Sequence, residues 1–384
     1  MTDRSASPPS GSRRRPLVVL LFGGRSSEHG VSVVTAGAVL RAIDRTKYDV
    51  LPVGITRDGR WVLTSDDPGR MVMVDRRQPT VEQLADTDRG NIVVSVDPTD
   101  RTVVRGERGA APKVLGEADV VFPVLHGPYG EDGTVQGLLE LSGIPYVGAG
   151  VLASAIGQDK EYMKRVFSAF GLAVGPYLVI RPREWHSDAA GARARISGFA
   201  DAYGWPLFVK PARAGSSIGI TRVDGREGLE DAIAEAHRHD AKIIVEALVQ
   251  GREIECGVLE FPDGPRASVP AEIPVPDAHA YYDFEAKYLD STPGVVPAAL
   301  TDSQTHEVRR LALKAFEAAS CEGLVRADFF LTEDGQFVIN EINTMPGFTP
   351  VSMYPQMWQA SGIGYGDLVD RLLQAALRRS TGLR

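Results

Sequence analysis

The chain has 384 residues, of which 43% are hydrophobic and 24% are charged, and its formal net charge is -8. No apolar run approaches the roughly 20 residues of a membrane-spanning helix, and the acidic charge argues against nucleic acid as the main partner. The two cysteines, Cys256 and Cys321, are too few for a disulfide framework, so we expect buried thiols in a cytoplasmic protein.

The N-terminal part reads as a tail followed by an α/β domain. Residues 1–16 are rich in Ser, Pro and Arg, and we expect a disordered tail. Three arginines before LVVLLF imitate a signal peptide, but this apolar run ends after six residues at a Gly-Gly pair, which excludes one. A strand at 17–22, a helix from about Ser32 and a strand at 50–55 then predict a βαβ unit.

The same domain, which we place at 17–149, has a polar stretch at about 58–117 that reads as a variable insertion. Weak strand signals occur there at 61–63 and 92–96. The apolar pattern returns at 120–127, and a helix is expected through 138–141. His126 ends that strand, where α/β sheets bind ligands, and we expect it to donate a hydrogen bond to substrate. The other six histidines are expected on the surface: His29, His186, His237, His239, His279 and His306.

A central domain is expected at 150–247. It begins with a helix carrying Asp159 and Lys160, and a later strand ends in Lys210, before the glycine- and serine-rich turn 214–219. A lysine, exposed backbone N–H groups and two hydroxyls together suit a polyanion, although a plain glycine-rich turn is the commoner explanation of such a pattern. The turn lacks the Walker A spacing. A helix at 228–237 and a strand at 243–246 complete this block.

A C-terminal domain at 248–384 contains a lid loop at about 271–299, an amphipathic helix with a stripe from Val308 to Phe316, and a hairpin. A two-residue type I′ turn at Asp334-Gly335 would set the hairpin register.

That register pairs Asp328 with Glu341 and Arg326 with Asn343, all four on one face. Hard oxygen ligands in this arrangement suit Mg²⁺. The alternative is an exposed hairpin whose polar face is solvated.

The order of these features resembles the ATP-grasp ligases, and six segments resemble D-alanine:D-alanine ligases in particular. They are GGRSSEHGVS (23–32), LHGPYGEDGTVQG (125–137), KPARAGSSIG (210–219), YYDFEAKY (281–288), RADFF (326–330) and NEINTMPGFTPVSMYP (340–355). The resemblance implies a three-domain fold of α/β and α+β type, with nucleotide bound between the central and C-terminal domains. One departure is Ala247, where many relatives carry a lysine.

The resemblance also implies a role for each matching residue. At the nucleotide, Lys160, Lys210 and Ser217 would meet the phosphates of ATP, and Glu246 and Glu253 would hold adenine and ribose. Asp328, Glu341 and Asn343 would coordinate two Mg²⁺ ions, with Mn²⁺ able to substitute.

At the amino-acid substrates, Glu28 would receive the ammonium group of the first D-alanine beside His126, and Ser216 and Tyr288 would close the lid. Arg326 and the Gly347 N–H would stabilise the oxyanion, Ser352 would bind the second D-alanine, and Lys287 would reach the transferring phosphate.

The expected activity is ATP-dependent ligation of two D-alanine molecules through D-alanyl phosphate, which supplies peptidoglycan precursor. A cytoplasmic homodimer with no membrane or nucleic-acid partner is expected. Two alternatives remain open: a ligase of this fold with another acceptor such as D-lactate, and a nucleotide-binding regulatory module without turnover.

Overall fold

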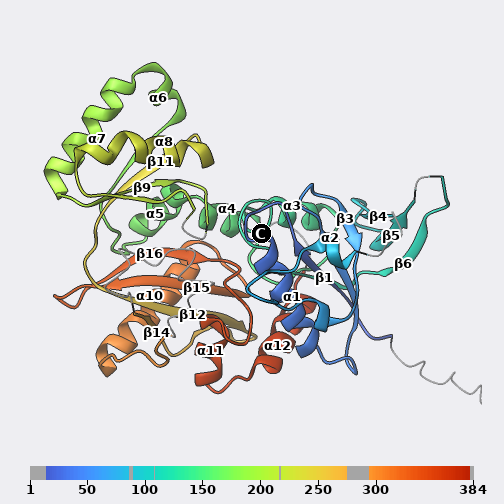
Figure 1. Ribbon diagram of the computed structural model, residues 1–384. Helices are drawn as coiled ribbons and strands as arrows, with labels where there is room; N and C mark the ends of the chain where they lie inside the picture. Colours follow the sequence, from blue (N-terminus) through green and yellow to red (C-terminus); the bar gives the residue numbers. More distant parts are fainter. Residues whose placement is uncertain (1–13, 86–89, 108, 216–217, 275–293, 381–384) are drawn as a thin grey trace, which may run out of the picture.

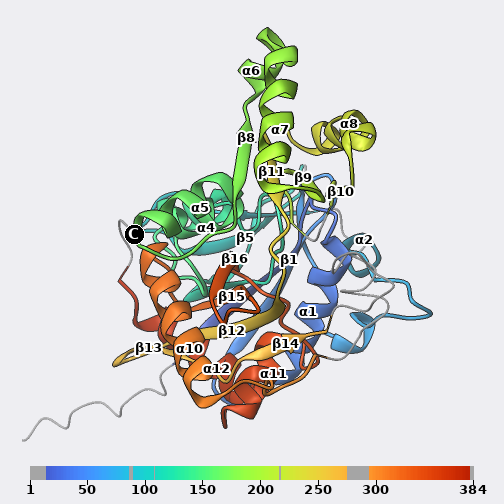
Figure 2. The same cartoon turned by 90° about the vertical axis from the view of Figure 1, so that its left-hand side faces the viewer.

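The computed structural model has three lobes (Figure 1), and its described residues form four sheets, two of them in the N-terminal lobe. The structure describes residues 14–85, 90–107, 109–215, 218–274 and 294–380, and every statement below refers to these residues. Seen from the side, the central lobe with α6, α7 and α8 projects away from the other two (Figure 2).

The N-terminal lobe contains the predicted βαβ unit. Strands β1 (Leu17–Gly23), β2 (Asp49–Ile55) and β7 (Val120–Pro123) are parallel, and β3 (Trp61–Leu63) pairs antiparallel with β2. Helix α1 (His29–Ala42) connects β1 to β2, and α3 (Thr134–Leu141) follows β7. The apolar run of β1 is buried, as is usual for a parallel strand covered on both faces.

Helix α1 begins three residues before the predicted Ser32, and this places His29 inside the fold. The prediction of a surface His29 is wrong: its exposed fraction is 0%. Its Nδ1 contacts the Gly24 carbonyl at 2.7 Å, and its Nε2 accepts the Val81 N–H at 3.0 Å. Among the other five, His186, His239 and His306 are exposed as expected, His237 is half-buried, and His279 lies outside the described residues.

The predicted insertion has more order than its sequence suggested. It contains η1 (Pro68–Arg70), α2 (Val81–Leu84) and an antiparallel sheet of β4 (Asn91–Val94), β5 (Thr102–Gly106) and β6 (Lys113–Glu117). The two later strands escaped prediction because each is short and interrupts its apolar residues with glycine and charged residues. Residues 14 and 15 of the predicted tail lie against this lobe through exposed ion pairs of Arg14 with Asp119 and of Arg15 with Asp49.

The central lobe is an antiparallel sheet in the order β10-β9-β11-β8, made of β8 (Tyr177–Ile180), β9 (Leu207–Pro211), β10 (Thr221–Val223) and β11 (Ile243–Ala247). Helices α6 (Pro182–Ser187), α7 (Ala189–Tyr203) and α8 (Leu229–His239) and the 3₁₀ turn η2 (Arg226–Gly228) complete it. Ile196 and Ile233 join its core.

Two helices rather than one precede this sheet. The single helix predicted around Asp159 is divided into α4 (Val151–Gln158) and α5 (Lys160–Ala169). Asp159 adopts an extended conformation, and its carboxylate caps α5 by accepting the Glu161 and Tyr162 N–H groups. Both helices pack against the C-terminal sheet, and the side chains of Met163 and Phe167 lie in its core.

The C-terminal lobe is a sheet of β13 (Gly264–Ala267), β12 (Arg252–Phe261), β15 (Leu324–Leu331) and β16 (Phe337–Asn343), with β14 (Ala271–Ile273) also on β12. Helix α10 (Asp302–Ala318) has the predicted apolar stripe and begins with a Thr301–Gln304 capping box. Helices α11 (Met353–Ala360) and α12 (Tyr365–Arg378) follow. In the predicted lid, Glu272 and Val295 exchange backbone hydrogen bonds, and 275–293 lie outside the described residues.

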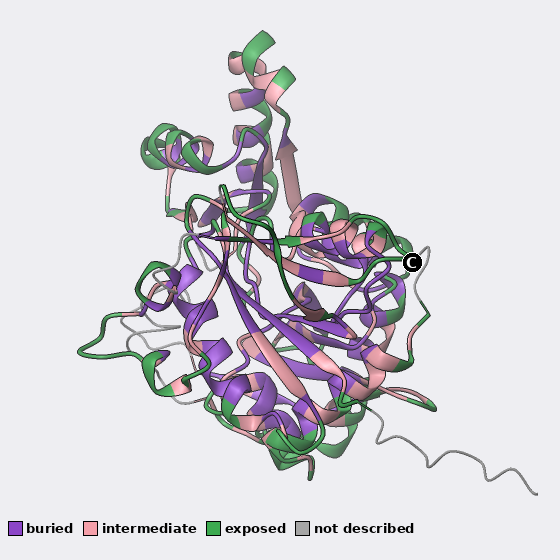
Figure 3. Cartoon of the chain, turned by 90° about the vertical axis from the view of Figure 1, so that its right-hand side faces the viewer, coloured by how far each residue is buried: buried purple, intermediate pink, exposed green. Residues whose placement is uncertain are grey.

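The buried residues lie mainly on the sheets and on the helix faces that cover them (Figure 3). Cys256 and Cys321 are buried free thiols, as predicted. Within the described ranges, no helix combines the length and apolar character needed to cross a membrane.

Candidate active site

The β15–β16 hairpin places four polar side chains on one face. Its register pairs Asp328 with Glu341 and Arg326 with Asn343, which confirms the predicted partners. Nearer the turn, however, Phe329 pairs with Ile339, so Asn340 is an extra residue in a β-bulge. This bulge reverses the alternation of β16: Phe337 and Ile339 face the core before it, and Ile342 faces the core after it. Glu341 and Asn343 consequently face the cleft.

The predicted two-residue turn at Asp334-Gly335 is wrong. Thr332 receives the Gly335 N–H and donates its own N–H to Gln336, so the loop spans Thr332 to Gln336. The Thr332 hydroxyl also donates to the Gln336 carbonyl at 2.9 Å and stabilises this wider loop. The longer loop shifts the pairing of β15 with β16 by one residue. The bulge at Asn340 shifts the pairing back, so that Asp328 still lies opposite Glu341.

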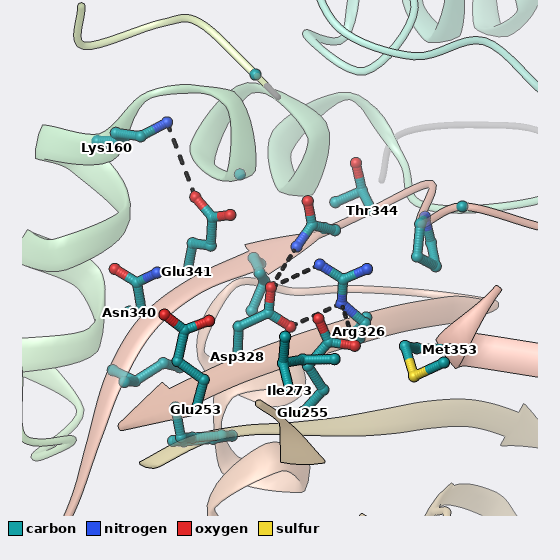
Figure 4. Close-up of a pocket in the computed structure, with 18 of the residues that line it drawn as sticks. Lys160, Glu253, Glu255, Ile273, Arg326, Asp328, Asn340, Glu341, Thr344 and Met353 are labelled. Atoms are coloured by element: carbon teal, nitrogen blue, oxygen red, sulfur yellow. Dashed lines mark hydrogen bonds and ion pairs between the residues drawn. The ribbon is translucent and has the colours of Figure 1, made fainter. Parts of the chain in front are cut away.

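Arg326 is held at the centre of this polar face. Its Nε and Nη2 donate to the two carboxylate oxygens of Asp328, each at 2.7 Å, and Glu255 of β12 lies 3.3 Å from Nε (Figure 4). Burial alone would lower the pKa of Arg326, but attraction to Asp328 and Glu255 raises it well above its ordinary value. The Asn343 amide nitrogen donates to Asp328 at 2.9 Å, which directs its amide oxygen away from that carboxylate.

Lys160 connects this face to the glycine-rich turn. Its Nζ donates to the Ala214 carbonyl at 2.8 Å and lies 3.8 Å from the Glu341 carboxylate, toward which it points in Figure 4. The ammonium group therefore stands between the β16 carboxylate and the turn that the sequence suggested for phosphates.

A buried ion cluster lies on the central-lobe side of the cleft. Glu246 accepts from Lys210 at 2.5 Å and pairs with Lys164 at 3.0 Å. Burial alone would raise the pKa of Glu246, but the two ammonium groups hold it well below its ordinary value. Both carboxylate oxygens are thus engaged by lysines, and contacts from this residue to an adenine would have to come from the backbone.

Replacing Lys164 by Met should weaken both the fold and nucleotide binding. The substitution leaves Glu246 with one cation, and losing a charged hydrogen bond in a buried site costs about 1.5 to 3 kcal/mol. Urea unfolding would measure this loss, and the KM for ATP should rise. Lys314→Met is a matched control, because Lys314 is a half-buried lysine that donates to the Gly171 carbonyl at 3.1 Å and does not line the cleft. Equal stability and equal KM in the two variants would contradict the role of the cluster.

Glu28 occupies the N-terminal side of the cleft, at the junction of two glycine loops. A Cβ atom at Gly127 would lie 3.0 Å from the Glu28 carboxylate, and one at Gly215 would lie 3.2 Å from it. Glycine at these positions lets both backbones approach the carboxylate.

His126 lies beside Glu28 and is 4% exposed. Its Nδ1 contacts the Met345 carbonyl at 3.1 Å, and because a carbonyl only accepts, Nδ1 carries the proton. Burial lowers the pKa of His126, which favours the neutral ring. Its Nε2 is then a hydrogen-bond acceptor, and it has no hydrogen-bond partner among the described residues. We had expected His126 to act as a donor toward substrate.

Glu131 is a second carboxyl beside Glu28, and the residue is half-buried. It accepts the Gly127 N–H at 2.8 Å and the Met345 N–H at 3.0 Å. Burial raises the pKa of Glu131 to about 8, and the charge of Glu28 adds to the shift. Glu28 and Glu341 are the charged groups that raise its pKa, and His126 contacts the carbonyl of the same Met345.

The raised pKa of Glu131 predicts a pH-dependent contribution to stability. The folded protein retains this proton between pH 4.5, the ordinary pKa, and about 8, so the group's contribution to the unfolding free energy falls as pH rises through that window. Glu131→Gln removes the titration. The difference in unfolding free energy, wild type minus variant, should fall from pH 5 to pH 8 in urea titrations. A constant difference would show that Glu131 titrates normally.

A single cleft of about 940 Å³ is lined by every predicted site residue that the structure describes. They come from all three lobes: Glu28, His126, Lys160, Lys210, Glu246, Glu253, Arg326, Asp328, Glu341, Asn343, Gly347 and Ser352. A Cβ atom at Gly347 would lie 3.2 Å from the Ser352 hydroxyl, so these two groups adjoin. Ser216, Ser217, Lys287 and Tyr288 lie outside the described residues.

The prediction from sequence missed three charged residues of the cleft: Glu131, Lys164 and Glu255. Two of them carried a usable signal. Lys164 is one helical turn after Lys160, and Glu255 is two residues after Glu253 on the same strand face. Glu131 lay within the quoted segment 125–137, where nothing in the local pattern distinguished it from a loop carboxylate.

The donor set of the hairpin suits a divalent cation completed by substrate. The cleft face offers the carboxylates of Asp328 and Glu341 and the amide oxygen of Asn343, which are the hard ligands Mg²⁺ prefers. The described part of the chain contains no group of three or more His, Cys, Asp or Glu side chains placed to hold a metal alone. Phosphate oxygens and water would supply the remaining positions, as is usual for Mg²⁺.

Comparison with known families agrees with this geometry. Residues 17–149 match the model described as D-ala D-ala ligase N-terminus, and residues 166–374 match D-ala D-ala ligase C-terminus. The chain belongs to the D-alanine–D-alanine ligase family. It is 74% identical over 383 residues to D-alanine–D-alanine ligase of Streptomyces avermitilis, covering 100% of both chains. It is 53% identical to that of Paenarthrobacter aurescens, again over 100% of both.

Solved structures of this family share the fold. VanG D-Ala:D-Ser ligase from Enterococcus faecalis superposes with a TM-score of 0.80 at 32% identity, covering 94% of this chain and 100% of that one. The D-alanine-D-alanine ligase from Coxiella burnetii gives 0.75 at 32% identity, covering 94% and 95%. The mixed ATP-grasp fold class expected from the sequence is thereby confirmed.

Proposed function

We propose that this chain joins two D-alanine molecules in an ATP-dependent reaction that gives D-alanyl-D-alanine, ADP and phosphate. The observation that carries the proposal is the position of Arg326 and the Asp328–Glu341 pair in one cleft with the Glu28 carboxylate and the Lys160 ammonium. Membership of the ligase family supports the reaction class, and the product is a peptidoglycan precursor.

The first chemical requirement is activation of a carboxylate. A carboxylate is a poor electrophile, so phosphoryl transfer from ATP would convert the first D-alanine into D-alanyl phosphate. Lys160 and Lys210 would neutralise phosphate charge, and Glu253 would hold the ribose. At the amino-acid end, Glu28 would bind the ammonium group and the acceptor Nε2 of His126 would receive a further N–H.

The second requirement is stabilisation of the tetrahedral oxyanion when the second amine attacks. The Arg326 guanidinium and the Gly347 N–H would donate to it, with Ser352 holding the carboxylate of the acceptor. Loss of one such donor typically costs about 10² to 10³ in rate. For this role Arg326 must share its N–H groups between the oxyanion and Asp328, which now holds two of them.

Two Mg²⁺ ions, with Mn²⁺ able to substitute, would be held by Asp328, Glu341 and Asn343. When bound, the ions would offset phosphate charge. Ser216, Ser217, Lys287 and Tyr288 would cover the site from the glycine-rich turn and the lid. A closed site is needed because water hydrolyses an acyl phosphate.

At the level of the cell, we propose a cytoplasmic homodimer. We propose three domains, at 17–149, 150–247 and 248–384, with nucleotide bound between the second and the third. The Lys210–Glu246 pair and the Asp328–Glu341 pair face one cleft from these two lobes, which supports that arrangement.

Substitution of the paired carboxylates tests the proposal directly. Asp328→Asn and Glu341→Gln should each abolish D-alanine-dependent phosphate release, because each removes a ligand charge without removing core volume. Glu341→Gln should change the melting temperature by only a few degrees, whereas Asp328→Asn should lower it further, because it leaves Arg326 with the Glu255 carboxylate alone. Near-normal magnesium-dependent turnover in either variant would contradict the assignment of these residues. A wild type that releases no phosphate with D-alanine would contradict the activity.

Competition between acceptors tests the substrate. With D-alanine and D-lactate at equal concentration, the product at pH 7.5 should be predominantly the dipeptide. The preference should grow with pH, since more free amine is available to attack. Mass spectrometry of the products distinguishes amide from ester, and D-serine belongs in the same experiment because a structural relative is named for it. A predominantly ester product would contradict D-alanine as the acceptor while leaving the ligase chemistry intact.

A further inference from the structure

Glu131 joins two segments that meet at the amino-acid end of the cleft. One oxygen accepts the Gly127 N–H from the loop after β7, and the other accepts the Met345 N–H from the loop after β16. His126 reaches the Met345 carbonyl from the same side. Both backbone polar groups of Met345 are therefore bound by the N-terminal lobe, two residues before Gly347.

The loop that carries Glu131 is itself fixed. The Glu131 N–H donates to the Gly127 carbonyl at 2.9 Å, and the Gln136 amide of α3 donates to the Gly130 carbonyl at 2.8 Å. A small cavity of about 10 Å³ behind the loop is lined by Glu131, Gln136 and Thr344. Its volume suits one water molecule, which would satisfy the Gln136 Oε1 that has no partner in the described chain.

We propose that Glu131 is a positioning residue whose two oxygens fix the Met345 backbone to the N-terminal lobe and thereby set the Gly347 N–H relative to Glu28. The inference rests on the proposed function, because the roles of Glu28 and Gly347 belong to it. Glu28 holds the electrophilic substrate and Gly347 stabilises the oxyanion that forms on it. The distance between the two groups therefore has to be fixed across a lobe boundary.

Only a carboxyl group meets this requirement. Both partners are N–H donors, and each of the two carboxyl oxygens has a lone pair for one of them, even when the group carries its proton. Glutamine has one acceptor oxygen and one NH₂ group, so either Gly127 or Met345 would face a donor. Aspartate is one methylene shorter and would not reach both segments. The raised pKa of Glu131 is consistent with this half-buried position beside Glu28.

The first test measures the clamp without using activity. Hydrogen–deuterium exchange by mass spectrometry should be faster in Glu131→Gln than in wild type for peptides covering 343–349. Peptides from α12 and from the central lobe should be unchanged. Glu140→Gln is the matched control, since Glu140 accepts the Tyr146 hydroxyl at 2.7 Å within the N-terminal lobe and does not reach Met345. Unchanged exchange at 343–349 in Glu131→Gln would overturn the proposal.

The second test separates positioning from structural support. In Glu131→Gln, kcat should fall at least about tenfold, because displacement of a catalytic group by about 1 Å costs up to 10²-fold. The KM for ATP should stay at the wild-type value, and circular dichroism should show a folded protein at the assay temperature. Glu140→Gln should retain wild-type kcat.

A lower melting temperature with wild-type kcat would reduce Glu131 to a structural residue and overturn the proposal. Failure of the proposed function has a different signature: an inactive wild type. In that case the catalytic part of the inference fails with it, while the exchange experiment still decides whether the clamp exists.

Discussion

The arrangement of the cleft depends on burying carboxylates next to a limited number of cations. Glu246 is held between Lys164 and Lys210, Asp328 is held by Arg326, and Lys160 lies near Glu341. Removing one partner of a buried ion pair destabilises the fold by about 3 to 5 kcal/mol, because the other charge stays buried without a partner. A polyanion that enters the cleft must therefore share these cations with the carboxylates. Nucleotide binding and the relative position of the lobes are thus linked, since Lys160 lies between Glu341 of the C-terminal sheet and the Ala214 carbonyl of the central lobe.

The β-bulge at Asn340 determines which side chains take part. In a regular strand, the odd-numbered residues from Phe337 onward would all face the core, and Glu341 would be buried among apolar side chains without a cation. The extra residue turns Ile342 into the core and directs Glu341 toward the cleft. A local irregularity of one residue therefore converts an ordinary amphipathic strand into part of a charged site.

The same bulge explains why the sequence predicted the site partners correctly and the turn incorrectly. A two-residue turn at Asp334-Gly335 and the actual three-residue loop at 333–335 differ by one residue in register, and the bulge offsets that difference. Alternation and turn residues are local signals, so they identified the hairpin, the βαβ unit and the stripe of α10. They could not identify Glu131 or His29, because the burial of both depends on segments distant in the chain, at Met345 and at Val81.

The family resemblance extended the prediction further than periodicity did, because it brought separated segments into one site. Even so, the resemblance gave each residue a role without saying which hydrogen bonds the residue makes. The tautomer of His126 follows only from its contact with the Met345 carbonyl. Likewise, Glu246 was expected at the adenine, whereas its carboxylate is engaged by two lysines, which leaves its backbone for that role.

The two ends of the cleft differ in charge, and this difference would favour phosphate groups at one end and an ammonium group at the other. The central-lobe side presents Lys164 and Lys210 around one carboxylate, whereas Glu28 and Glu131 flank Gly127 at the other end. Burial raises the pKa of Glu131 to about 8, and the charge of Glu28 adds to the shift because two carboxyl groups so close to each other cannot both ionise without cost. A substrate ammonium group beside Glu28 would relieve that repulsion, and a hydroxyl would not. Under the proposed function, the electrostatics would favour an amino acid beside Glu28, and acceptor choice would depend on the groups near Ser352.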